Sequence, residues 1–111
     1  MIEYLIISYL NTHVSAPVHA EIPAKRTKRF VVVEKMGGER ENRLDSSTIS
    51  FKSYASTLYE TMELNRMVKE AVESMTDLDE ICCCEYGGDY NDTDTDTKTY
   101  CYRAVYQITH Y

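Results

Sequence analysis

One long amphipathic stretch, residues 53–75, constrains the fold more than any other part of the chain. Apolar side chains recur in it at spacings of three and four residues, the period of a helix with one buried face. They are Ala55, Leu58, Tyr59, Met62, Leu64, Met67, Val68, Ala71, Val72 and Met75. No Gly or Pro interrupts the run. The pattern predicts one helix over 54–75, about 30 Å long, with Leu58, Met62 and Val72 buried.

Two starting points for this helix are compatible with the sequence. Ser53 can act as the N-cap, because its hydroxyl can accept a hydrogen bond from a first-turn N–H group. A capping box starting there would need Glu or Gln at position 56, which is Ser56. Thr57 followed by Glu60 does have the spacing of a capping box. The start at Thr57 therefore competes with the start at Ser53.

The segments around the long helix have the patterns of one short helix and several strands. Met1 to Asn11 carries a helical apolar stripe, and strands are expected near 18–22, 29–36, 47–52, 80–86 and 99–110. The pairs Gly37–Gly38 and Gly87–Gly88 are expected to form turns that open polar loops. This order predicts an α+β domain. Its antiparallel or mixed sheet of four or five strands would carry the long central helix and the short N-terminal helix.

Length and composition agree with a single globular domain over residues 1–111. The chain is 43% hydrophobic and 27% charged, which is ordinary for a folded domain and unlike a disordered tail. Its apolar runs are too short to span a bilayer. The N-terminus lacks the basic and apolar regions of a signal peptide. We therefore expect a cytosolic protein without membrane contact.

Charge is unevenly distributed along the chain. Residues 1–53 contain 8 Lys or Arg and 6 Asp or Glu, whereas residues 54–111 contain 4 and 12. Opposed patches of this kind favour docking between proteins, while a general nucleic-acid binder would be basic overall. The candidate interface residues on the basic side are Lys25, Arg26, Lys28, Arg29, Arg40 and Arg43. Those on the acidic side are Glu60, Glu63, Glu70, Glu73, Asp92, Asp94 and Asp96.

Three aspartates, Asp92, Asp94 and Asp96, have the spacing that opens an EF-hand calcium loop. The pattern then fails, because Thr97 stands where Gly is needed for the turn and Arg103 where a bidentate Glu is needed. A solvated acidic loop is the simpler interpretation, with weak calcium or magnesium binding as the alternative. We expect no tight metal site here.

No other motif indicates catalysis or a cofactor. The run Cys82–Cys84 and the single Cys101 lack the spacing of a zinc site, so reduced, half-buried cysteines in strands are expected. The three histidines are scattered, and no Ser, Cys and His fall in a nucleophile signature. The glycine pairs lack the contexts that bind phosphate. We expect a protein that is not an enzyme and binds no cofactor.

The chain resembles the small tail completion or tail terminator proteins of long-tailed bacteriophages, including prophage copies. The resemblance covers nearly the whole chain. It rests on the opening MIEYLIISYLN, on the block SYAS-x-LYE with Asn65 and Val68–Lys69, and on the ending DYNDTDTDTKTYCYRAVYQITHY. The run Cys82–Cys84 is not part of the family pattern.

The resemblance implies a non-enzymatic virion assembly protein with an α+β fold and helices on one side of the sheet. Members of that family form a ring, commonly a hexamer, that caps the tail tube and presents a surface to the head. The implied partners are further copies of the chain, the tail-tube protein and a head-completion protein. DNA would pass through the ring without specific binding, which acidic residues lining the channel would favour. The implied location is the host cytoplasm during assembly and then the virion tail.

The charge pattern suits such a ring, because head-to-tail contacts join two different patches of each subunit. Two other classes stay open. One is another phage interaction module, either a head–tail connector or a small acidic inhibitor directed at a host protein. The other is a small hydrolase or metal-dependent enzyme. A terminator should oligomerise, an inhibitor should stay monomeric or dimeric, and an enzyme should show a converging polar pocket.

Overall fold

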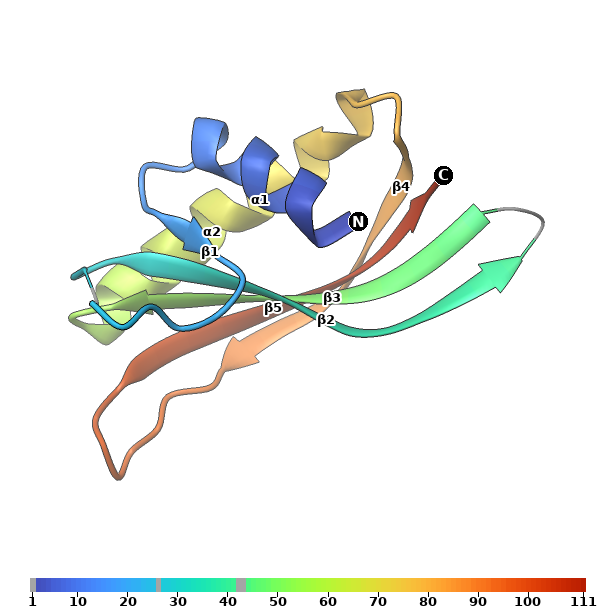
Figure 1. Cartoon of the computed structure of the whole chain (residues 1–111). Helices are drawn as coiled ribbons and strands as arrows, with labels where there is room; N and C mark the ends of the chain where they lie inside the picture. The colour runs from blue at the N-terminus through green and yellow to red at the C-terminus, as the bar shows by residue number, and fades with distance from the viewer. Residues whose placement is uncertain (1, 26, 42–43) are drawn as a thin grey trace.

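The computed structural model describes residues 2–25, 27–41 and 44–111, and it confirms the expected α+β class (Figure 1). Two helices lie on one face of a five-stranded sheet. The elements in chain order are α1 (Ile2–His13), β1 (Val18–His19), β2 (Phe30–Glu41), β3 (Leu44–Ala55), α2 (Leu58–Glu73), the 3-10 helix η1 (Ser74–Asp77), β4 (Ile81–Asn91) and β5 (Tyr100–His110).

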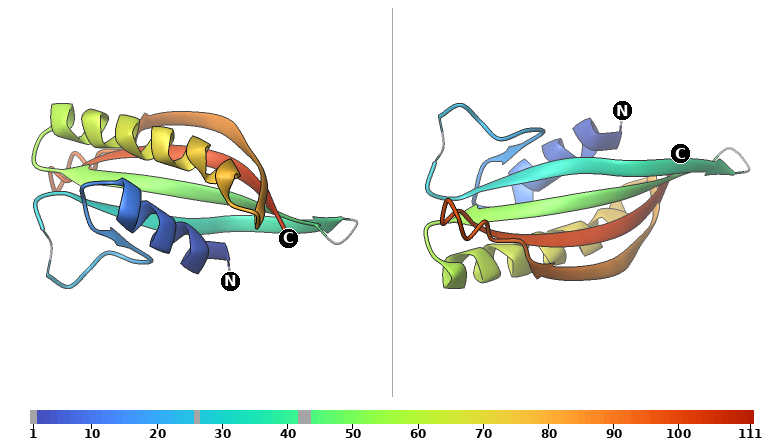
Figure 2. Two further views of the ribbon diagram at one scale, coloured as in Figure 1. Left: turned by 90° about the horizontal axis from the view of Figure 1, so that it is seen from above. Right: turned by 90° about the horizontal axis from the view of Figure 1, so that it is seen from below.

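The sheet is mixed, with strand order β1-β2-β3-β5-β4. Only the short β1 runs parallel to its neighbour β2, and all other pairs are antiparallel. Strand β5 therefore lies between β3 and β4. Helix α2 packs over β3 and β5 on the side of β4, while α1 packs near β1 and β2 (Figure 2). Among the described residues, no helix lies on the other face of the sheet (Figure 2).

The main core lies between the helices and the sheet. Alternate residues of a strand point to the same face, so each central strand contributes every second side chain. The fully buried side chains are Val31 and Val33 from β2, Ile49 and Phe51 from β3, Ala104, Tyr106 and Ile108 from β5, Leu64, Val68 and Val72 from α2, Met75 from η1, and Ile6 and Leu10 from α1.

Helix α2 is shorter than predicted, beginning at Leu58 and ending at Glu73. Thr57 is its N-cap, because the Thr57 hydroxyl accepts a hydrogen bond from the backbone N–H of Glu60 at 3.1 Å. Ser53 belongs to β3 and is buried. Of the two predicted starts, the one at Thr57 is therefore correct. The end of the predicted helix forms η1 instead.

The buried face of α2 also differs from the prediction at its first turns. Leu58 and Met62 are 37% and 48% exposed, so the expectation that both are buried is wrong, whereas Val72 is fully buried. Thr61 and Asn65 take the inward positions. They can be buried because Thr61 donates to the Thr57 carbonyl at 2.8 Å and the Asn65 amide donates to a carboxylate of β4.

Both glycine pairs lie within strands, so their assignment to turns is wrong. Strand β2 runs through Gly37–Gly38 to Glu41, and β4 runs through Gly87–Gly88 to Asn91. Each pair adjoins a β-bulge, where one extra residue interrupts the regular pairing. Gly88 has φ of 121°, a backbone conformation that glycine adopts readily. Strand β1 is shorter than the 18–22 predicted.

Candidate functional site

The most distinctive surface of the fold consists of two strand edges. Strand β4 pairs only with β5, and β2 pairs with β1 only at Val31 and Val32. In the described part of the chain, no strand pairs with the outer side of Val33–Glu41, here called the β2 edge, or of Ile81–Asn91, here called the β4 edge. An edge strand presents unpaired N–H and C=O groups that can bind another strand.

Of the predicted basic residues, Arg40 lies in the β2 edge, and Lys25, Lys28 and Arg29 lie before β2. Lys25 and Lys28 are exposed in the segment that leads into β2. Arg29 is half-buried, and its guanidinium donates to the sulfur of Met67 at 3.8 Å. Arg40 lies in the β2 edge and pairs with Asp45 at 3.3 Å. Arg26 and Arg43 lie outside the described residues.

The predicted acidic residues of α2 lie toward the other side of the sheet. Glu60, Glu63, Glu70 and Glu73 are exposed or half-exposed. Arg66 bridges Glu63 at 3.3 Å and Glu70 at 2.8 Å, so part of this charge is neutralised within the helix. Helix α2 packs on the β4 side of the sheet (Figure 2), so these carboxylates lie on that side.

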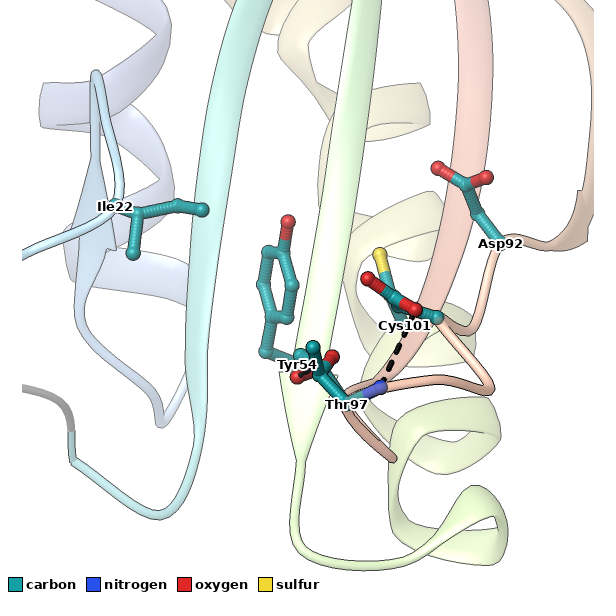
Figure 3. A pocket seen from close by; sticks show the side chains of 7 residues that line it. Ile22, Tyr54, Asp92, Thr97 and Cys101 are labelled. Carbon is teal, nitrogen blue, oxygen red and sulfur yellow. Dashed lines mark hydrogen bonds between the residues drawn. The ribbon is translucent and has the colours of Figure 1, made fainter.

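The remaining acidic residues, Asp92, Asp94 and Asp96, lie apart from α2 in the connection between β4 and β5. The Asp94 carboxylate accepts from the backbone N–H of Asp96 at 3.0 Å, and Asp92 pairs with Arg103 at 3.1 Å. The same connection lines a cavity of about 530 Å³, which also touches the segment before β2 of the same chain (Figure 3). The lining residues are Ile22, Tyr54, Asp92, Asp94, Thr97, Thr99 and Cys101.

The Asp94 hydrogen bond organises a turn within the acidic connection. Across residues 2–25, 27–41 and 44–111, no three His, Cys, Asp or Glu side chains gather as a metal site would require. The four cysteines are free.

A polar network that the sequence analysis did not identify joins α2 to the β4 edge. The Asp89 carboxylate accepts from the Asn65 amide and the Lys69 ammonium, both at 2.8 Å, and also from the Tyr86 hydroxyl. The Lys69 ammonium also lies 5.6 Å from the centre of the Tyr86 ring. Burial alone would raise the pKa of Asp89, but these hydrogen bonds hold it below its ordinary value.

Next to this network, the Tyr106 hydroxyl donates to Glu73 at 2.6 Å. Burial raises the pKa of Tyr106 far above its ordinary value, and the neighbouring carboxylate adds to the effect. The helix residues Asn65, Lys69 and Glu73 are spaced four apart, so the flank of α2 toward β4 is polar. That spacing in the sequence could have suggested a polar flank, but nothing in the sequence identified Asp89 as its partner.

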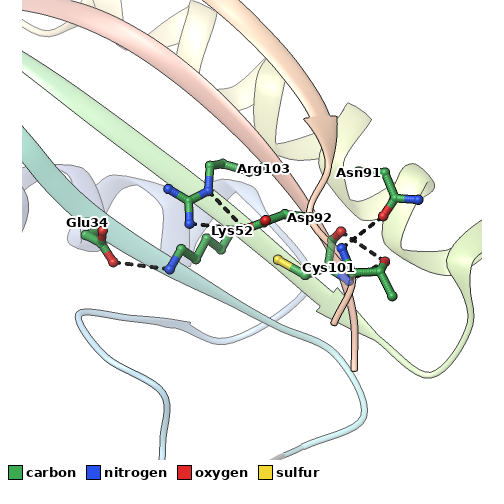
Figure 4. A network of polar contacts seen from close by, with 7 residues as sticks. Glu34, Lys52, Asn91, Asp92, Cys101 and Arg103 are labelled. Carbon is green, nitrogen blue, oxygen red and sulfur yellow. Dashed lines mark hydrogen bonds and ion pairs between the residues drawn. The ribbon is translucent and has the colours of Figure 1, made fainter. Parts of the chain in front are cut away.

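The uncovered face of the sheet carries a second set of charges. Lys52 and Arg103 lie on adjacent strands in register, and each has its own carboxylate: Glu34 at 3.3 Å for Lys52 and Asp92 at 3.1 Å for Arg103 (Figure 4). A small apolar cluster of Phe30, Val32, Tyr54 and Cys101 lies beside them. Burial raises the pKa of Tyr54 to about 12 and that of Cys101 to about 11. Lys52 and Arg103 are therefore each neutralised by a carboxylate of the same chain.

One Ser–His pair resembles part of a catalytic dyad. The Ser47 hydroxyl lies 2.9 Å from Nε2 of His110, and both side chains are buried between the helix layer and the sheet. The Nδ1 atom of His110 faces the Tyr111 carbonyl at 3.4 Å rather than a carboxylate. Ser47 is only 1% exposed, so a substrate cannot reach its hydroxyl in this conformation. The pair links β3 to β5.

A search of protein-family models and a search of curated proteins found no match to this chain. No helix in the described ranges is long and apolar enough to cross a membrane. The candidate functional site comprises two sheet edges that pair with no further strand among the described residues, basic residues before and within β2, and the acidic helix and Asp89 network near the β4 edge.

Proposed function

We propose that this protein is a structural protein of a long-tailed bacteriophage, of the tail completion or tail terminator kind, and that it acts as a ring on the tail tube. The sequence resemblance spans nearly the whole chain, and the fold has its helices on one side of an α+β sheet as that family would. The observation that carries the proposal is that one sheet has two unlike edges that pair with no further strand in the described part of the chain.

Unlike edges favour a ring for a geometric reason. When a patch on one copy binds a different patch on the next, the growing assembly keeps one free patch at each end, and it becomes a ring when the rotation from copy to copy closes. Basic residues before and within β2, and the acidic helix near the β4 edge, would orient such contacts. Exposed apolar side chains on both sides, including Met36 and Tyr86, would add affinity.

Within this proposal, the ring joins the tail-tube protein on one side and a head-completion protein on the other, and DNA passes through without specific binding. Assembly takes place in the host cytoplasm and the protein remains in the virion tail. The net charge of −6 supports a channel that repels phosphate. The acidic surface of α2 also favours a second candidate, a connector or a small acidic inhibitor that imitates another anionic surface.

Particle mass by light scattering, measured over a range of concentrations and salt, tests the proposal. We expect monomers that close into a ring as concentration rises, with assembly weakened by salt. The double variant Lys25→Glu with Lys28→Glu should assemble poorly. Lys25→Arg with Lys28→Arg, which keeps both positive charges, is the control. A protein that stays monomeric or dimeric, also when tail tubes are added, would point to the inhibitor instead.

A tail function needs a second readout in particles. A phage lacking this gene should produce tails that do not join heads, and the wild-type gene should restore joining. If such a phage makes complete virions, the proposed function is wrong whatever the particle mass.

A further inference from the structure

We propose that copies of this chain join by extending the sheet, the β4 edge of one copy pairing antiparallel with the β2 edge of the next. This inference rests on the proposed function, because it specifies the contact that builds the ring. It commits to a second copy of the chain as the occupant of both edges.

Strand directions within one copy support this pairing. Each of the pairs β2–β3, β3–β5 and β5–β4 is antiparallel, so β4 runs opposite to β2. When a second copy is placed beside the first in the same orientation, its β2 therefore meets β4 as an antiparallel neighbour. Such a head-to-tail arrangement leaves the other edge of each copy free for the next one.

The β-bulges near the centres of the two edge strands are also compatible with this pairing. Strand β2 has one extra residue, Met36, between Lys35 and Gly37, and β4 has one at its centre, Gly87, between Tyr86 and Gly88. A second irregularity of β4, between Ile81 and Cys83, lies at the start of the strand. Both bulges adjoin the same row of paired residues, which runs Lys35, Ile49, Tyr106, Tyr86 across the sheet. Met36 lies on one side of this row and Gly87 on the other. When the rows of two copies are aligned, the two extra residues therefore offset each other, and one antiparallel register pairs Glu34 with Gly88 and Gly38 with Cys84.

Backbone orientation agrees on either side of these bulges. The Val31 N–H donates to the Pro17 carbonyl, away from β3, whereas the Asp92 N–H donates to the Cys101 carbonyl, toward β5. N–H and C=O groups alternate in direction along an antiparallel strand. These two hydrogen bonds therefore identify the residues of each edge whose backbone groups point away from the sheet. They fall on the same rows of the sheet: Val33 with Asp89, Lys35 with Tyr86, and Gly38 with Cys84.

Side chains on the meeting rows are complementary. Lys35 lies on the helix-covered face opposite Ile49. In the proposed contact, Lys35 of one copy would therefore lie beside Tyr86 of its neighbour and near the neighbour's Asp89 carboxylate. Met36 and Tyr86 are 52% and 54% exposed in the isolated chain, and the pairing would bring them close together. The opposite choice, β4 against β4, would place the acidic residues of this edge against their own copies.

The glycines give an independent indication. All four glycines of the chain lie in these two edge strands. Gly88 needs its positive φ, but Gly37 has none, and a Cβ at Gly37 would meet no atom within 4 Å. Packing within one chain therefore does not explain Gly37. Glycine in a strand often marks a place where another backbone approaches closely.

A single substitution tests the pairing, because Glu39 lies on the same row as the native Cys83. Both residues point their backbone groups inward, so across the new contact they would form a non-hydrogen-bonded pair with Cα atoms about 4.5 Å apart. That distance suits a disulfide. Glu39→Cys should therefore form an intermolecular disulfide with Cys83 under mild oxidation.

The expected result is a ladder of dimers, trimers and larger species on a non-reducing gel, with the Cys83 bond identified by mass spectrometry. Glu34→Cys is the matched control, because it lies on the same strand and face but opposite Gly88. Adding Cys83→Ser to Glu39→Cys should abolish the ladder. Dimers alone, or a bond from position 39 to another cysteine, would overturn the pairing.

Light scattering on the same samples distinguishes a failure of the edge pairing from a failure of the proposed ring. A ring that forms without a bond to Cys83 would refute the edge pairing and leave the proposed ring intact. A protein that shows neither ring nor ladder, with or without tail tubes, would refute both.

Discussion

Replacing Asp89 with Ala removes the acceptor shared by Asn65, Lys69 and Tyr86. The Lys69 ammonium is partly exposed and can bind water instead, so the loss of its ion pair should cost less than about 1 kcal/mol. The exposed Tyr86 hydroxyl can also bind water, so the loss of its hydrogen bond should add little. The Asn65 amide is buried and would lose the only acceptor of its N–H groups in the described structure, at about 1–3 kcal/mol. We expect a total loss of about 2–3 kcal/mol in the free energy of unfolding.

The assay is urea denaturation at neutral pH, at a concentration where the protein is monomeric. Asp79→Ala is the control, since it removes an exposed carboxylate and should change stability by less than about 0.5 kcal/mol. In a double-mutant cycle, Asn65→Ala should cost less in the Asp89→Ala background than alone, because the two residues share one hydrogen bond.

The pH dependence gives a second check with a definite sign. The pKa of Asp89 is lowered from its ordinary value of 3.8, so its contribution to stability is present above that value. It is lost as pH falls through the lower pKa of the folded state. The difference between wild type and Asp89→Ala should therefore be constant near neutrality and shrink below 3.8. A loss under about 0.5 kcal/mol at neutral pH, or an unchanged difference in acid, would refute the reasoning.

Three further predictions concern the helix and the thiols. Val72→Asp should destabilise the protein by at least about 3 kcal/mol in urea denaturation, because it buries an unpaired charge, whereas Met62→Asp should cost less than about 1 kcal/mol. Thr57→Ala removes the cap of α2 and should cost about 1 kcal/mol, measured the same way. Burial raises the pKa of Cys84 and Cys101 to about 11, so iodoacetamide at mildly alkaline pH should modify the exposed Cys82 first, as peptide mapping would show.

The competing starts of α2 show how far local sequence rules reach. A cap forms between residues three apart, so Thr57 and Glu60 could be recognised from spacing alone. The buried face could not be placed as well, because apolar residues occur nearly all around the first turns. Which of Leu58, Thr61 and Met62 is buried depends on how the sheet lies under the helix.

The glycine pairs show the opposite case. In a single sequence, Gly–Gly beside charged residues is typical of a turn. A bulge needs the same conformational freedom, and only the neighbouring strand distinguishes the two. Strands β3 and β5 continue past these positions, so β2 and β4 continue with them. The Asp89 network was missed for a similar reason, since its members come from two elements separated in the chain.

The sequence by itself determined the α+β class, the order of the elements, most of the core strands and the division into a basic and an acidic half. These follow from periodicity and composition, which act over short distances along the chain. Only the tertiary structure decided that β5 lies between β3 and β4 and that two bulged edges pair with no further strand among the described residues. It also decided that the strands of the two halves of the chain lie on opposite sides of one sheet. Those features depend on which strands pair over long separations, and pairing energy is shared among many contacts that no local pattern records.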